Sequence, residues 1–189
     1  MTKEPPSPWY TWDPFVLSET ITLAQALATI PPSPIQKMPL LVRILENPAS
    51  PFPLAGPTSI FDHDCIHVVL GRGLLQQDEG FVIGYSVGNA SDSSALDRLL
   101  FRDLSALYPK PYTFMDNDLI SFDHGFDCGA SSSLRDMHLF PFSECVNRTI
   151  GSVRKELALC RRQLRAWFRE EVTLIPSSKA SRRLRLHMA

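Results

Sequence analysis

The chain has 189 residues, 44% of them apolar and 21% charged, which is typical of one globular domain and excludes a disordered chain. No stretch approaches the roughly 20 apolar residues that a membrane-spanning helix needs. The first 15 residues resemble neither a secretory signal nor a transit peptide, so we expect a cytoplasmic protein. The four cysteines form no CxxC pair, and neither a disulfide framework nor a cysteine zinc knot is expected.

The net charge of −1 hides two unequal parts. Residues 1–140 carry a balance of −8, whereas residues 141–189 carry +7. The acidic part suits a cation site. The basic end suits an anionic surface or, alternatively, the acidic part of the same molecule.

The first half of the chain predicts a proline-rich arm followed by helices. Residues 1–17 form the arm, which we expect to lie irregularly against the body, and a single helical domain spans residues 18–176. Ser18 or Thr20 is a candidate N-cap for a helix that ends before Pro31-Pro32. Helical apolar spacing indicates a second helix over residues 35–45, and residues 47–58, with four prolines, predict a loop.

Three more helices are predicted in the middle of the chain. Ser59 caps a helix that runs to about Leu70, where Gly71 and Gly73 break it. A further helix follows over residues 76–87, and leucines on one side predict another over residues 92–107.

The last third divides into an irregular part and a regular one. Residues 112–140 show little periodicity, so we expect a long ordered loop with at most a short helix. After it, a 4-3-4-3-4-3 apolar stripe predicts one long C-terminal helix packed against another helix of the same chain or of a dimer partner. The stripe residues are Val146, Ile150, Val153, Leu157, Cys160, Leu164 and Trp167. Residues 177–189 are expected to be a frayed basic tail. The predicted fold class is mainly α.

A candidate metal site begins with two histidines on the helix after Ser59. His63 and His67 are four residues apart, so both imidazoles lie on one helix face and can reach one ion. In a continuous helix, Glu79 would lie about 18 Å further along the axis. A turn at Gly71 and Gly73 instead folds the next helix back and brings Glu79 level with the histidines. Asp64 is either a fourth ligand or a partner that orients an imidazole.

The donor set of two imidazoles and one or two carboxylates suits zinc best, with manganese or iron as the other candidates. A bare HxxxH pair more often has no ion, and the returning Glu79 is what favours a site. We therefore predict a metal site of His63, Asp64, His67 and Glu79, between two adjacent helices.

The pattern His63-Asp64-x-x-His67-x11-Glu79 resembles the zinc motif of the fourth Coq protein family of ubiquinone biosynthesis factors, and the likeness covers about residues 36–90. The resemblance implies a helical fold, bound zinc, peripheral membrane association, dimers and grooves for lipid. It also implies a role in assembling the quinone-biosynthetic complex and in replacing a ring carboxyl of the prenylated precursor by hydroxyl. A zinc-dependent decarboxylase or hydroxylase step is therefore one expectation.

Two alternatives remain open at this point. One is a non-catalytic lipid-binding or scaffold protein with a structural metal. The weaker one is a metal-dependent phosphohydrolase of the HD type, which needs further ligands from a second polar group. That group consists of Asp123, His124, Asp127, Cys128, Asp136 and His138, and such groups are more often hydrogen-bonded loops.

Basic residues recur every seven positions in the predicted C-terminal helix, at Arg148, Lys155, Arg162 and Arg169, with Arg154, Arg161 and Arg165 nearby. Such a row is most often a solvated face, and the functional alternatives are an anionic membrane surface, nucleic acid or an acidic partner. Aromatic residues do not alternate with the basic ones, so nucleic acid is not an expected partner. The expected partner is a prenylated quinone precursor or another lipid.

Overall fold

The computed structural model describes residues 9–31, 54–108, 110 and 113–188. Within these ranges the chain is helical and contains no strand, so the predicted mainly α fold is confirmed. The α-helices are α1 (Leu23–Leu27), α3 (Ile60–Leu70), α4 (Gln76–Asn89), α5 (Ala95–Ser105), α6 (Asp116–Ala130), α7 (Ile150–Glu156), α8 (Arg161–Leu174) and α9 (Lys179–Arg185). None of them is both long enough and apolar enough to cross a membrane.

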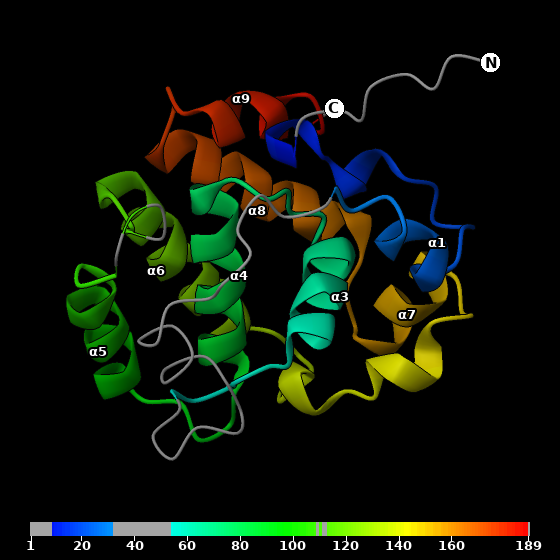
Figure 1. The fold of residues 1–189 in the computed structure, drawn as a ribbon, viewed down its shortest axis with the longest axis horizontal. Coiled ribbons are helices and arrows are strands. Elements are labelled where there is room, and N and C mark those ends of the chain that lie inside the picture. Colours follow the sequence, from blue (N-terminus) through cyan, green and yellow to red (C-terminus); the bar gives the residue numbers. More distant parts are fainter. Residues whose placement is uncertain (1–8, 32–53, 109, 111–112, 189) are drawn as a thin grey trace.

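Helix α3 lies between two groups of helices (Figure 1). On one side α4 leads to α5 and α6, and on the other α3 packs against α1 and α7. A large apolar core surrounds α3, and a smaller one forms where α4, α5 and α6 meet around Phe101 and Phe122. The metal-binding candidates on α3 and α4 therefore lie between two apolar clusters.

Local sequence signals define α3 well. The Ser59 hydroxyl accepts a hydrogen bond from the Asp62 amide, and Gly71 ends the helix with a left-handed φ of 71°. Both bounds agree with the prediction. Helix α1 is much shorter than predicted, because the side chain of Thr22 caps it rather than that of Ser18 or Thr20. The helix predicted over residues 35–45 lies outside the described residues.

The prediction of a loop over residues 112–140 was wrong, because residues 116–130 form helix α6. This helix packs along α4 at very short range. A β-carbon on Gly84 would overlap the carbonyl oxygen of Phe122, and one on Gly125 would overlap that of Phe81. Gly80, Gly88 and Gly129 make similar backbone approaches. Glycine weakens an isolated helix, but here it allows two backbones to touch.

Helix α5 is present as predicted, but its leucines do not form core. Leu96 and Leu99 are exposed, whereas Phe101 on another face is buried and stacks on Phe122 of α6. Arg98 and Arg102 of α5 form ion pairs with Asp123 of α6. Helix α5 is thus attached through the Phe101 ring, which contacts Phe114 and Phe122, through the partly buried Leu104, and through the ion pairs with Asp123.

The single long helix predicted over residues 146–167 is two helices. Helix α7 ends at Glu156, and α8 begins at Arg161 after a turn in which Ala158 has a left-handed φ of 55°. Ile150, Val153, Leu157, Leu164 and Trp167 are still buried, in the same core, but Cys160 is exposed. An apolar spacing fits two short helices on one core as well as one long helix, so it did not reveal the break.

The basic residues of this region do not follow one helix face either. Arg154 is 2% exposed and donates to the carbonyl oxygens of Val68 and Val69 and to Glu19. Arg148 forms an ion pair with Glu156. Part of the basic charge is therefore matched within the chain.

The predicted frayed tail is also wrong, because it contains helix α9, capped by Ser178. Leu184 is buried, and Arg183 forms an ion pair with Asp78 of α4. The same end of the chain contacts the N-terminal arm through His187, whose Nε2 lies 2.6 Å from Asp13. These contacts explain why α9 and the arm lie together in Figure 1.

A buried polar cluster joins α4, α6 and α8. Glu171 and Arg72 are both fully buried and form an ion pair. The other carboxylate oxygen of Glu171 accepts from Gln77 Nε2 at 2.5 Å and from Ser121 Oγ at 3.0 Å. Arg72 also lies over the ring of Phe81, 3.4 Å from its centroid. The cluster fixes the start of α4 relative to α8.

We expect Gly84→Ala to lower the free energy of unfolding by up to about 2 kcal/mol. Alanine favours an isolated helix by roughly 1 kcal/mol, but here its methyl group meets the α6 backbone, and such overpacking costs about 1–3 kcal/mol. Gly151→Ala is the control, because its nearest neighbours, on Glu19, are 3.2 Å away. Urea denaturation measures both, and a Gly84→Ala protein more stable than wild type would contradict the close packing.

We expect Glu171→Ala to destabilise the protein by about 3–5 kcal/mol, because it leaves the Arg72 charge buried and uncompensated. Glu170→Ala is the matched control, since that neighbouring side chain is 63% exposed. The double change Arg72→Met with Glu171→Leu should recover part of the loss. Equal stability of the Glu171→Ala and Glu170→Ala proteins in thermal melts would rule out this account of the cluster.

Candidate metal centre

Helices α3 and α4 bring His63, His67 and Glu79 together. The left-handed Gly71 ends α3, and α4 starts five residues later and returns beside it (Figure 1). Gly73 has a different role from the one predicted, because its φ is not left-handed. A β-carbon there would overlap the Arg183 side chain and press on the Trp12 carbonyl, so Gly73 allows other segments to pack against the turn.

The three ligand atoms lie within bonding range of one ion. Glu79 Oε2 is 3.0 Å from His63 Nε2 and 3.3 Å from His67 Nε2, and the two imidazole nitrogens are 3.0 Å apart. Tetrahedral zinc with bonds of about 2.0–2.1 Å places neighbouring ligands about 3.3–3.4 Å apart. The cluster therefore has nearly the size of one face of a zinc tetrahedron.

The three side chains differ in their access to solvent. His67 is 1% exposed, whereas the side chains of His63 and Glu79 are 23% and 27% exposed. The side of the cluster that has no protein ligand is thus most accessible to solvent near His63 and Glu79. The Nδ1 atom of His67 is buried without a hydrogen-bond partner among the described residues, so no hydrogen bond on that side orients this ring.

The charges of Glu79 and the two histidines stabilise one another. Burial by itself would raise the pKa of Glu79, but His67 and hydrogen bonds from both histidines hold it well below its usual range. Burial would lower the pKa of His67, but the attraction and hydrogen bond of Glu79 raise it. The Glu79 carboxylate thus remains ionised and can accept a hydrogen bond from an imidazole N–H or bind a cation held between it and the two nitrogens.

Asp64 does not join these three residues in the structure. It is half-buried, and burial raises the pKa of its carboxyl although His67 and His63 lower it. Its charge is therefore close enough to interact with the cluster, but the convergent group consists of His63, His67 and Glu79 alone. Among the described residues no hydrogen bond joins Asp64 to either imidazole, so the structure shows neither of its predicted roles, fourth ligand or orienting partner.

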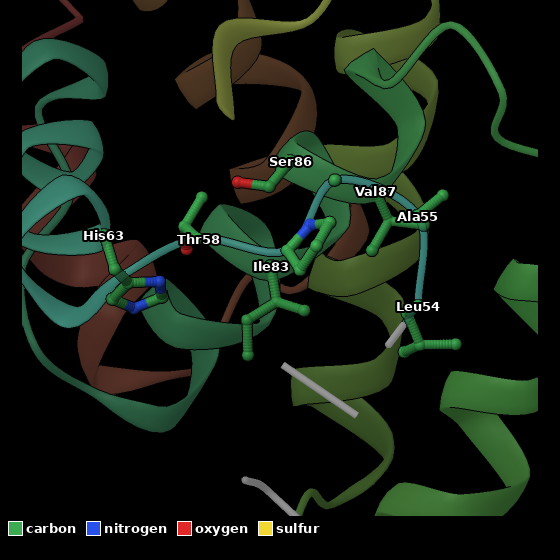
Figure 2. Close-up of a pocket in the computed structure, with 9 residues that line it drawn as sticks. Leu54, Ala55, Thr58, His63, Ile83, Ser86 and Val87 are labelled. Carbon is green, nitrogen blue, oxygen red and sulfur yellow. The ribbon is translucent and has the colours of Figure 1, made fainter. Parts of the chain in front are cut away.

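A narrow cleft adjoins the cluster, and His63 forms part of its wall (Figure 2). Leu54, Ala55 and Thr58 line it from the segment that leads into α3, and Ile83, Ser86 and Val87 line it from α4. The walls are mostly apolar, with the hydroxyl groups of Thr58 and Ser86 and the His63 ring as polar groups. The enclosed space is about 20 Å³, enough for about one water molecule.

The second polar group predicted from the sequence divides into separate contacts. Asp123 pairs with the arginines of α5, as does Asp127 with Arg98. Asp136 accepts a hydrogen bond from the Ser91 amide at 2.7 Å. Only His124 and Cys128 converge, and the residue that joins them is Glu170 of α8, which the sequence analysis did not single out. Neither His124 nor His138 belongs to the His63 cluster.

No model of a protein family matches this chain, and no curated protein or solved structure matches it either. The resemblance to the ubiquinone biosynthesis factors therefore stays a prediction, which rests on the spacing of the motif residues. The geometry supports a group that could hold a metal ion.

We expect the purified protein to bind one zinc ion at this cluster and His67→Ala to weaken binding at least tenfold. The change removes one of two nitrogen ligands, a loss at least as large as those of outer partners, which cost about 10–100-fold. His138→Ala is the matched control, since His138 lies outside both convergent groups. Competition titration with a chromophoric chelator measures the affinities, and equal zinc binding by the His67→Ala protein would exclude the site.

Proposed function

We propose that this chain is a zinc-dependent protein of quinone biosynthesis, which acts on or binds a prenylated quinone precursor beside the His63–His67–Glu79 cluster. Manganese and iron are the other candidate ions. The proposal joins two arguments: the donor set, which suits zinc, and the motif, which resembles that of the fourth Coq protein family.

One observation carries the proposal: His63 belongs both to the metal cluster and to the wall of the apolar cleft. A ligand in the cleft would thus lie next to the ion. Three protein ligands leave a fourth position free for water or substrate, as in catalytic zinc sites. When bound, zinc would polarise a substrate oxygen or make a bound water more acidic.

The described side chains suggest how a ring would be held. Ile83 and Val87 of α4 provide apolar contact at the cleft, and Thr58 and Ser86 place hydroxyl groups beside it. The Ser86 hydroxyl donates to the Val82 carbonyl at 3.0 Å, so it can only accept from a ligand. His67 is held in the interior and fixes the inner side of the cluster, while Glu79 supplies a negative charge. These groups would orient a polar ring substituent toward the ion and its apolar part toward the cleft.

The alternative is a non-catalytic lipid-binding or scaffold protein with a structural metal. The enclosed space of about 20 Å³ favours it, because sites for small molecules usually measure about 300–1,000 Å³. An HD-type phosphohydrolase is less well supported, since the additional histidines that it requires lie outside the cluster among the described residues.

Peripheral membrane association and dimer formation also belong to the proposal. The exposed leucines of α5, with Ile60 and Phe61 at the start of α3, provide apolar surface for such contacts. Exposed apolar side chains on a surface often mark interaction sites.

We expect Thr58→Trp to block the cleft without removing a metal ligand. The variant should bind zinc with unchanged affinity but bind a prenylated hydroxybenzoate at least tenfold more weakly than the wild type, because the indole would cover the entrance of the cleft beside His63. Thr173→Trp is the matched control, as Thr173 is exposed on α8. Isothermal titration of the zinc-loaded proteins tests this, and equal ligand affinity in both variants, or no binding by the wild type, would refute the proposed ligand site.

A further inference from the structure

A second convergent group lies away from the zinc cluster, between α6 and α8. His124 and Cys128 are one turn apart on α6, and Glu170 is on α8. One ligand atom from each lies within 4.8 Å of those of the other two. We propose that His124, Cys128 and Glu170 form a second metal site, for a zinc-class divalent ion.

The hydrogen bond of His124 fixes which nitrogen is available. Its Nε2 lies 3.0 Å from the carbonyl oxygen of Trp167, and a carbonyl only accepts, so Nε2 carries the hydrogen. In a neutral imidazole Nδ1 is then the free acceptor. Metal-binding histidines commonly donate their other N–H to a backbone carbonyl in this way, which fixes the tautomer and the ring orientation.

The sulfur of Cys128 stands at the distance that a shared ion requires. Its Sγ is 3.8 Å from Nδ1 of His124. Zinc bonds of about 2.3 Å to sulfur and 2.0–2.1 Å to nitrogen, at a tetrahedral angle, separate the two ligand atoms by about 3.6 Å. The observed distance is close to this value, but the sulfur is equally far from Nε2, at 3.8 Å, so an ion at Nδ1 requires the Cys128 side chain to turn toward that nitrogen.

The exposed Glu170 gives an ion access from solvent and supplies a negative charge that balances the charge of the ion. Glu170 is 63% exposed, and its Oε2 lies 3.9 Å from Nε2 of His124, the nitrogen that faces the Trp167 carbonyl. To reach an ion at Nδ1, the carboxylate therefore has to rotate toward that nitrogen from the solvent side. Burial lowers the pKa of His124 most, and the positive charge of Arg72 lowers it further. Because Arg72 is paired with Glu171, its repulsion of a bound ion is largely offset.

Binding at this site exchanges a proton for the ion. Burial raises the pKa of the Cys128 thiol well above its ordinary value, so the thiol is protonated when no ion is bound. A divalent ion binds the thiolate form of Cys128, and the S–H proton is released to water. The neutral imidazole of His124 loses no proton, and neither sulfur nor metal changes oxidation state.

Cobalt(II), which takes the tetrahedral sites of zinc and absorbs light, tests the proposal in the metal-free protein. A sulfur-to-cobalt charge-transfer band in the near ultraviolet reports on thiolate ligation, and the His63 cluster contains no sulfur ligand. We expect this band in the wild type and in His67→Ala, and its loss in Cys128→Ser. Cys160→Ser is the matched control and keeps the band, because Cys160 is exposed on the turn before α8.

Glu170→Gln supplies a test that does not depend on changing the interior. The exposed substitution should weaken cobalt binding, followed by the same band, at least tenfold, whereas Glu144→Gln, also exposed, should leave it unchanged. No band in the wild type, a band that survives in Cys128→Ser, or unchanged affinity in Glu170→Gln would overturn the site. None of these results depends on whether zinc binds at His67.

Discussion

The contact between the backbones of α4 and α6 is the constraint on which most of the structure depends. Glycines at every fourth position of α4 leave no side chain between the two helices, so their axes approach as closely as the main chains allow. Helix α4 carries Glu79, the inner wall of the cleft and Gln77 of the buried polar cluster. Its placement therefore determines the metal cluster, the cleft and the contact to α8 together.

Buried charge complements this packing. The ion pair of Arg72 with Glu171 sits just after α3 and joins the turn before α4 to α8, and Arg183 joins Asp78 of α4 to α9. Buried pairs add little stability compared with apolar residues of equal volume, but removing one partner is costly. They therefore restrict the α3–α4 turn to one arrangement, in which Glu79 faces the histidines. Arg183 of the basic C-terminal part thus helps to hold the α3–α4 turn.

The two convergent groups have similar architectures, and each could hold a metal ion with a different set of donor atoms. In both, two ligands come from successive turns of one helix and a glutamate from a neighbouring helix completes the set. The first group contains only nitrogen and oxygen donors, and the second adds a sulfur atom. Helix geometry explains the recurrence, because side chains four residues apart lie on one face and a packed neighbour supplies the third ligand.

The sequence by itself determined the features that depend on residues close together along the chain. The cap at Ser59, the end of α3 at Gly71 and the shared face of His63 and His67 follow from local rules, and the turn predicted the return of Glu79. Only the tertiary structure decided the rest. Helix α6 contains glycines that an isolated helix disfavours, and its stability comes from contact with α4. The break at Ala158 and the approach of Glu170 to His124 depend on packing between distant segments, which no local pattern records.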